Sequence, residues 1–211
     1  MPAPMADVSG IILAGGRSRR LGRDKRDVIV GGVALLDRAV ALCAPLVDGL
    51  LIVAREAGPP RRGVPVVADE ISDRGPMAGV LTGLRRSRHP RMLVIPVDMP
   101  LLTAEFLRFL IRIAPEAEIT VPRWERGIEP LVAVYTRSCL GPLADALARG
   151  ATALHAFIQS AGRSVRFVDA SEIAPFGRPE RLFFNINTAE EVAAAEAMLA
   201  EEIRPSRSAP P

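Results

Sequence analysis

The chain has 211 residues, of which 49% are hydrophobic and 24% are charged. This balance excludes a largely disordered chain, and the length suits one α/β domain with a buried core but is short for two domains. The formal net charge is +3, with 27 basic residues against 24 acidic ones. A basic chain of this kind raises the question of nucleic-acid binding.

The excess of positive charge belongs to one short segment. Residues 17–27 contain six basic and two acidic side chains, so the rest of the chain carries 21 basic and 22 acidic residues, a net charge of −1. Lys25 lies in this segment and is the only lysine in the sequence; all other basic residues are arginines. Because nucleic-acid-binding proteins spread basic residues over a whole face, we expect no nucleic-acid partner.

Short apolar runs rich in β-branched residues predict strands along most of the chain. The predicted strands are Val8–Leu13, Leu50–Val53, Val64–Val67, Met92–Val97, Ile119–Val121, Leu131–Tyr135 and Val165–Val168. Helical patterns separate several of them. The alternation predicts a three-layer α/β fold with a mostly parallel sheet, in which ligands bind at the carboxyl ends of the strands.

The predicted helices carry recognisable start signals. Thr103 is a candidate N-cap for a helix over residues 103–114, which Pro115 would end. A second helix is expected over Leu140–Leu147. Thr188-Ala-Glu-Glu191 reads as a capping box that opens the last helix, with Val192 and Met198 or Leu199 on its inner side.

We expect one domain over residues 8–203, with Pro/Ser-rich tails at residues 1–7 and 204–211. Cys43 and Cys139 have no spacing that suggests a disulfide framework or a zinc site. The first residues lack the basic start and apolar run of a signal peptide, and no apolar stretch is long enough to span a membrane. These features predict a cytoplasmic protein with no membrane contact.

The loop after the first predicted strand has the composition of an anion-binding loop. Gly15 and Gly16 let backbone N–H groups approach an anion without interference from a Cβ atom. Arg20 and Lys25 then add positive charge where the oxygens of a triphosphate would lie. The pattern is neither a Walker A loop nor a Rossmann fingerprint. A tight glycine turn followed by a solvated arginine-rich loop is the alternative interpretation.

This loop, LAGG-x-x-x-R-x-G-x-DK over residues 13–25, resembles the signature of nucleotidyltransferases that join NTPs to phosphorylated acceptors. Within them it is most similar to the molybdenum cofactor guanylyltransferase family. Four further segments resemble that family in the same order: Asp69 with Gly75–Gly79, Ile95–Pro100, Glu129–Tyr135 and Asn185–Thr188. The resemblance spans about residues 8–200 and implies a Rossmann-like nucleotidyltransferase fold.

The resemblance also implies roles for individual residues. Lys25, Arg20 and Asp98 would be catalytic, and the nucleotide would be bound by Leu13, Ala14, Gly15, Gly16, Lys25, Asp69, Gly79 and Asp98. Asp98 would hold Mg²⁺, which prefers hard oxygen ligands together with nucleotide phosphates, although an Asp at a strand end also serves as a turn cap. Asn187 would lie near the metal and the acceptor phosphate, or else make only local turn bonds.

The activity that this resemblance implies is Mg²⁺-dependent transfer of GMP from GTP to the phosphate of molybdenum-loaded molybdopterin, with release of pyrophosphate. Molybdoenzyme maturation proteins would be further partners. Trp124 could stack on the pterin of the acceptor. Because Ala54-Arg55 stand where the family often has an Asn, a cytidylyltransferase or a transferase for another phosphorylated acceptor stays open. A non-catalytic nucleotide-binding partner is the alternative from another class.

Overall fold

The protein is described by a computed structural model that covers residues 7–15, 24–71, 74–160 and 162–203. Its strands are β1 Val8–Leu13, β2 Ile29–Val30, β3 Val33–Ala34, β4 Gly49–Ala54, β5 Gly58–Arg61, β6 Val64–Ala68, β7 Arg91–Pro96, β8 Ile119–Trp124, β9 Gly127–Ile128, β10 Ala133–Thr136 and β11 Val165–Val168. Its helices are α1 Leu35–Cys43, α2 Pro76–Arg86, α3 Ala104–Ile113, α4 Leu140–Ala148, α5 Leu154–Gln159, α6 Ala170–Ile173, α7 Pro179–Leu182 and α8 Ala189–Ile203. Short 3₁₀ turns complete the chain, among them η1 Lys25–Asp27.

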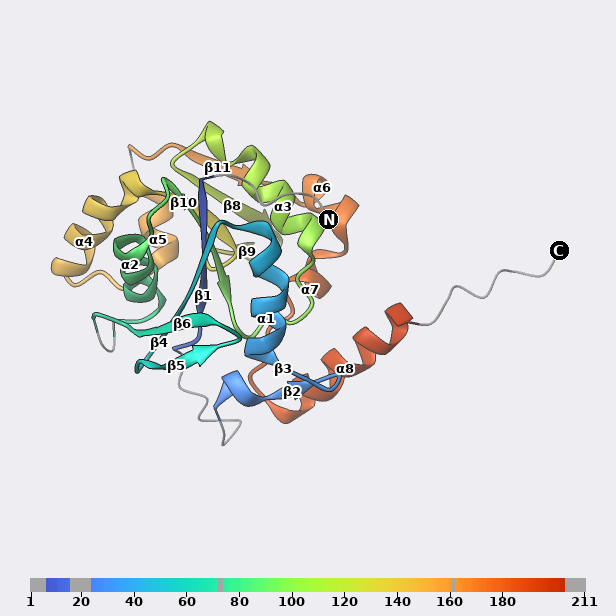
Figure 1. The fold of residues 1–211 in the computed structure, drawn as a ribbon. Coiled ribbons are helices and arrows are strands. Elements are labelled where there is room, and N and C mark those ends of the chain that lie inside the picture. The colour runs from blue at the N-terminus through green and yellow to red at the C-terminus, as the bar shows by residue number, and fades with distance from the viewer. Residues whose placement is uncertain (1–6, 16–23, 72–73, 161, 204–211) are drawn as a thin grey trace.

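One large sheet runs through the molecule in the order β11-β8-β10-β7-β1-β4-β6-β5, with β9 paired to β8 (Figure 1). The strands β7, β1, β4 and β6 are parallel to one another, β11 is parallel to β8, and the edge strand β5 is antiparallel to β6. The strand β10 is inserted antiparallel between β7 and β8. The prediction of an α/β fold with a mostly parallel sheet is therefore confirmed.

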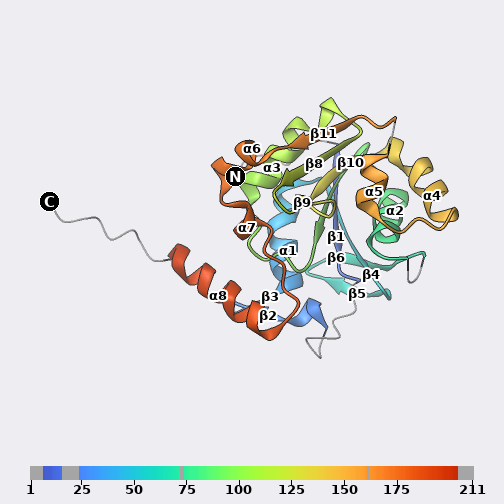
Figure 2. The ribbon, with the colours of Figure 1, turned by 180° about the vertical axis from the view of Figure 1, so that it is seen from behind.

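Helices cover both faces of the sheet. Figures 1 and 2 show α1 and α3 on one face and α2, α4 and α5 on the other. Alternation along β1 sorts its side chains between the two layers, because successive residues of a strand point to opposite faces. Ile12 is buried in the cluster under α1 and α3, whereas Ile11 is buried in the cluster under α2 and α4. The result is the expected three-layer arrangement.

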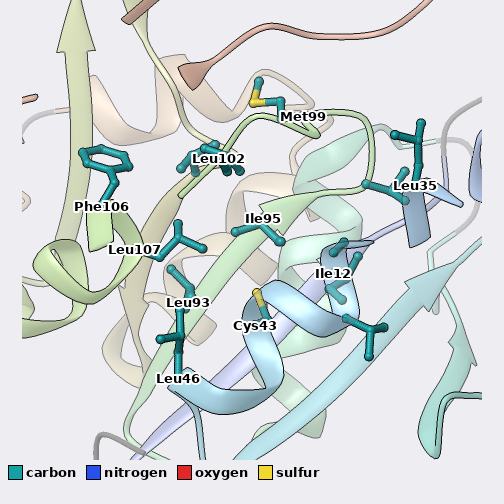
Figure 3. Close-up of a cluster of buried hydrophobic side chains, with 14 of the residues drawn as sticks. Ile12, Leu35, Cys43, Leu46, Leu93, Ile95, Met99, Leu102, Phe106 and Leu107 are labelled. Carbon is teal, nitrogen blue, oxygen red and sulfur yellow. The ribbon is translucent and has the colours of Figure 1, made fainter. Parts of the chain in front are cut away.

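The larger of the two cores lies between the sheet and helices α1 and α3. Figure 3 shows Leu93 and Ile95 of β7 within this cluster, together with Cys43 of α1 and with Phe106 and Leu107 of α3. All five side chains are at most 1% exposed. This packing fixes the direction of β7, whose carboxyl end leads directly into the candidate site.

Several predicted boundaries agree with the structure. β1 covers the predicted residues, and the Thr103 hydroxyl accepts the backbone N–H of Phe106 at 3.3 Å as the N-cap of α3. The predicted capping box also forms, because Glu191 N–H donates to the Thr188 hydroxyl at 3.2 Å and Thr188 N–H donates to the Glu191 carboxylate at 3.0 Å.

The strand expected over Leu131–Tyr135 begins later than predicted, at Ala133. The reason is a turn in which Val132 N–H donates to the carbonyl oxygen of Glu129 at 3.0 Å. The last helix, α8, contacts the larger core through Val192 and Leu199, as predicted. Within the described part of the chain, no helix has the length and apolar character to cross a bilayer.

Candidate active site

A pocket of about 400 Å³ opens where β1, β4, β6 and β7 end. Register pairs Leu13 of β1 with Val53 of β4 and with Pro96 of β7, so the carboxyl ends of these strands are level. This is the edge at which ligands bind in parallel sheets. Among the described residues the pocket is lined by Leu13, Gly15, Val53, Ala54, Arg55, Asp69, Gly75, Pro76, Gly79, Pro96, Asp98, Met99, Leu131 and Asn185.

Lys25 lies at the centre of the polar contacts in this region. Its Nζ atom donates to Oδ2 of Asp98 at 2.6 Å and to Oδ1 of Asn187 at 2.7 Å. The side chains of Lys25 and Asp98 are only 12% and 18% exposed. Lys25 opens the 3₁₀ turn η1, where the Asp24 carboxylate accepts the backbone N–H of Arg26 and so fixes the backbone that carries the lysine.

Asp98 and Asn187 are brought together by a direct backbone link. Ile186 N–H donates to the carbonyl oxygen of Asp98 at 2.9 Å, which joins the end of β7 to the segment before α8. The backbone N–H groups of Asn187 and Thr188 both donate to the Glu191 carboxylate in the capping box. Because these bonds hold the Asn187 backbone, its amide oxygen is held next to the Asp98 carboxylate.

The oxygens of Asp98 and Asn187 suit a divalent metal. A carboxylate and an amide oxygen are hard ligands, and Mg²⁺ typically completes its coordination with phosphates and water rather than with more protein groups. No group of three or more His, Cys, Asp or Glu side chains within the described ranges could hold a metal without such help. The donor set therefore fits a metal that is shared with a nucleotide. The same oxygens now accept from Lys25, so the ammonium and a metal compete for them.

Asp69 lies on the opposite side of the pocket, directly after β6. Its Oδ1 atom accepts the hydroxyl of Thr82 at 2.8 Å and the backbone N–H of Ile71 at 3.2 Å. Its own backbone N–H donates to the carbonyl oxygen of Ala54 at 2.7 Å. These bonds hold one carboxylate oxygen against the protein, and the residue lines the pocket. Asp69 is thus placed to accept hydrogen bonds from a ligand, as the resemblance implies.

Gly79 is required by the packing of α2 against β1. A Cβ atom at this position would lie 2.9 Å from Cδ2 of Leu13, which is closer than real Cβ contacts. Gly83, one turn later, would place a Cβ atom 3.0 Å from Ile11. The two glycines let the helix approach the strand closely and carry its first turn to the pocket.

Gly15 differs from Gly79. A Cβ atom there would find its nearest described neighbour, the backbone nitrogen of Arg55, at an ordinary 3.6 Å. Packing within the described residues therefore does not demand a glycine at position 15. A glycine at this position would let an anion approach the backbone closely.

The remaining predicted residues have mixed outcomes. Leu13 lines the pocket. Ala14 is buried, and its N–H extends the β1–β4 pairing by donating to the carbonyl oxygen of Val53 at 2.8 Å. Gly16 and Arg20 lie outside the described residues. The resemblance implies that Asp98 and Asn187 lie near one metal, but it does not imply the direct hydrogen bonds from Lys25 to both of them.

A second group of polar and aromatic residues flanks the pocket beyond Leu131. The indole N–H of Trp124 donates to Oε1 of Glu129 at 2.8 Å. Burial raises the pKa of Glu129, which this hydrogen bond and the charge of Arg126 partly oppose. The Trp124 ring lies 5.9 Å from the ring of Phe183 and 5.4 Å from the Arg126 guanidinium. Sequence reasoning considered Trp124 alone and missed Glu129, although this glutamate begins the matched segment Glu129–Tyr135.

Residues 10–168 match the family described as "MobA-like NTP transferase domain". The chain belongs to this family. A relative from Chloroflexus aggregans is 36% identical over 208 residues, covers 94% of this chain and is itself covered to 98%. That MobA-like relative is named "Probable molybdenum cofactor guanylyltransferase".

Solved structures agree on the MobA-like fold. Molybdopterin-guanine dinucleotide biosynthesis protein A from Archaeoglobus fulgidus has a TM-score of 0.77 at 22% identity, covering 92% of this chain and 99% of its own. A protein from Mycobacterium tuberculosis, described as a complex with manganese, has a TM-score of 0.64 at 20% identity, covering 91% and 99%. As a member of the family, the protein is a nucleotidyltransferase.

Proposed function

We propose that the protein transfers GMP from GTP to the phosphate of molybdenum-loaded molybdopterin, forming molybdopterin guanine dinucleotide and pyrophosphate. The observation that carries this proposal is the convergence of Lys25, Asp98 and Asn187 at the end of the pocket. It occurs in a chain that is 36% identical, over nearly its full length, to a relative named for this activity.

Different residues would contact different parts of the nucleotide. Gly15 and Gly16 admit the phosphates to the backbone, and Lys25 and Arg20 balance the negative charge of the triphosphate. Asp69 accepts hydrogen bonds from the purine edge. The Leu13 side chain and the backbone at Gly79 border the nucleotide. Ala14 is buried next to Leu13, where its N–H extends the β1–β4 pairing.

Asp98 and Asn187 would hold Mg²⁺, which supplies charge neutralisation at the phosphates when it is bound. A metal held by these oxygens would be repelled by the Lys25 ammonium, which lies 2.6 and 2.7 Å from them. The negative charge of a bound triphosphate would offset this repulsion and would offer Lys25 a new partner. Binding of the metal would then depend on the nucleotide.

The protein does not need a nucleophile of its own. The acceptor phosphate is already anionic and attacks the α-phosphorus, while pyrophosphate leaves. Catalysis then consists of holding the two substrates in line and stabilising the charge that they bring. The reaction takes place in the cytoplasm, within the folded region 8–203, and molybdoenzyme maturation proteins receive the product.

The proposal is tested with purified protein, the four NTPs and molybdenum-loaded molybdopterin, by measuring pyrophosphate release with Mg²⁺ and after chelation. We expect release with GTP only, and only when metal and acceptor are both present. A preference for CTP would indicate a cytidylyltransferase, the alternative that Ala54-Arg55 keeps open. Tight GTP binding without pyrophosphate release would indicate a non-catalytic partner.

A further inference from the structure

Two carboxylates lie on opposite sides of Asp98 in the order of the strands, and one of them, Asp69, lines the pocket. Asp69 follows β6 on one side, and Glu129 precedes β10 on the other. Because β10 is antiparallel to β7 and pairs Ala133 with Val94, the turn before β10 lies at the edge where β7 ends. Leu131, two residues after Glu129, lines the pocket itself. Glu129 thus lies in the turn that leads to the pocket on the side away from Asp69, next to the lining residue Leu131 and not itself among the described residues that line the pocket.

Glu129 is held in a fixed position by its neighbours. Its Oε1 atom accepts the indole N–H of Trp124 at 2.8 Å, and its backbone N–H donates to the carbonyl oxygen of Pro122 at 3.0 Å. Trp124 is held in turn by its contacts with Phe183 and Arg126. The arrangement matches that of Asp69, where Oδ1 is also occupied by groups of the protein. In both cases one carboxylate oxygen is anchored within the described structure.

The charged form of the Glu129 carboxylate is only partly stabilised by its described neighbours, the Trp124 indole and the Arg126 guanidinium, so that its pKa is raised overall. Burial raises the pKa of Glu129 because it disfavours the charged form, and a ligand with two adjacent N–H groups would compensate for this cost. Such a donor pair exists on the 2-amino-4-oxopyrimidine edge, which guanine and pterin share. With one carboxylate for the guanine of GTP and another for the pterin of the acceptor, the enzyme would bind both substrates through the same type of edge.

We propose that Glu129 binds the 2-amino-4-oxopyrimidine edge of the acceptor pterin, while Asp69 binds the corresponding edge of guanine. This inference rests on the proposed function, because it takes a pterin as the acceptor. Glu129 is then a specificity-determining residue, and Trp124 is a positioning residue that orients it rather than a platform on which the pterin stacks.

The chain provides its own probe for this contact, because Trp124 is its only tryptophan. Titration with 6-hydroxymethylpterin should change the intrinsic tryptophan fluorescence of the wild-type protein. The matching lumazine, which carries an oxygen in place of the 2-amino group, should bind about tenfold more weakly, since a carboxylate facing that oxygen is repelled. Equal binding of the two compounds, or no response to the pterin, would overturn the proposal without any variant.

Glu129→Gln is the decisive variant, because it keeps the acceptor for the Trp124 indole but loses the charge. We expect pterin affinity to fall about tenfold and the preference over lumazine to disappear. Glu125→Gln, an exposed residue in the turn of the same hairpin, is the matched control and should behave as wild type. Wild-type pterin affinity in Glu129→Gln would contradict the assignment.

A comparison of GTP with inosine triphosphate, which lacks the 2-amino group of guanine, tests whether Glu129 binds the guanine instead of the pterin. Glu129→Gln should leave the preference for GTP unchanged, whereas a loss of that preference would show that Glu129 binds guanine and would overturn the proposal. In turnover assays, Glu129→Gln should raise KM for the acceptor and not for GTP. Failure of the proposed function is distinguishable, because it would appear as an absence of GTP-dependent pyrophosphate release in the wild type.

Discussion

The two sides of the pocket are built by different means. The proposed nucleotide wall, made of Leu13, Gly15, Asp69 and Gly79, consists largely of backbone brought close by glycines at the tight contact between α2 and β1. The proposed acceptor wall consists of Leu131 and Asn185, which line the pocket, and of Trp124 and Glu129 next to them, whose side chains are held by a hydrogen bond and a ring contact. Backbone contacts recognise phosphates that all nucleotides share, whereas side chains can be changed to suit one acceptor. Asp98, Lys25 and Asn187 lie between the two walls.

The largest effect is expected where the two walls meet. Asp98→Asn should lower Mg²⁺-dependent pyrophosphate release by about a thousandfold, because it removes the one carboxylate of the metal position. The rate is measured at several Mg²⁺ concentrations, with thermal melting to show that the variant folds. Wild-type turnover at ordinary Mg²⁺ would place the metal elsewhere.

Lys25→Met should reduce turnover by about a hundredfold through loss of charge at the triphosphate. In the absence of nucleotide, however, the same variant should bind Mn²⁺ more tightly than wild type, since the competing ammonium is gone. Electron paramagnetic resonance measures free Mn²⁺ in both proteins. Arg26→Met removes the same charge one residue away and should not tighten the binding; equal Mn²⁺ affinity in Lys25→Met and wild type would refute the competition between Lys25 and the metal.

On the nucleotide wall, Asp69→Asn should raise KM for GTP about tenfold and reduce the preference for GTP over inosine triphosphate. It should not affect binding of the pterin, so it is the counterpart of Glu129→Gln on the other wall. A change in pterin affinity of the same size would show that the two walls do not act separately.

Two glycine substitutions distinguish a packing role from a ligand-binding role within the nucleotide wall. Gly79→Ala should destabilise the fold by about 1–3 kcal/mol, because its methyl group meets Leu13. Gly15→Ala should leave the melting temperature nearly unchanged and raise KM for GTP several-fold, since the described chain leaves room for the methyl group. Thermal melting and steady-state kinetics on both variants test the distinction, and a stable Gly79→Ala would be the contrary result.

Sequence reasoning succeeded where a local rule governs. β1 follows from its apolar run, and the starts of α3 and α8 follow from the caps at Thr103 and Thr188, because those bonds involve residues only three apart. The close contact between α2 and β1 has a related origin: close approach of a helix to a strand requires glycine, and Gly79 and Gly83 are visible in the sequence.

The acceptor wall could not be predicted in this way. Glu129 owes its position to Trp124 across a hairpin turn, and Trp124 owes its own to Phe183, some sixty residues further along the chain. The start of β10 also differs from the prediction. A turn closed by the backbone hydrogen bond from Val132 N–H to the Glu129 carbonyl delays the strand from Leu131 to Ala133. No local pattern encodes such contacts.

The hydrogen bonds from Lys25 to Asp98 and Asn187 have a consequence for the order in which the protein becomes functional. Lys25 lies near the start of the chain and Asn187 near its end, 162 positions apart. Asn187 is held by the turn that leads into α8, by the bond from Ile186 to Asp98 and by its own bond from Lys25. During synthesis the sheet can assemble well before α8 exists, yet one of the two metal-facing oxygens is missing until that helix docks. Under the proposed function, the metal site would thus be complete only after α8 has docked.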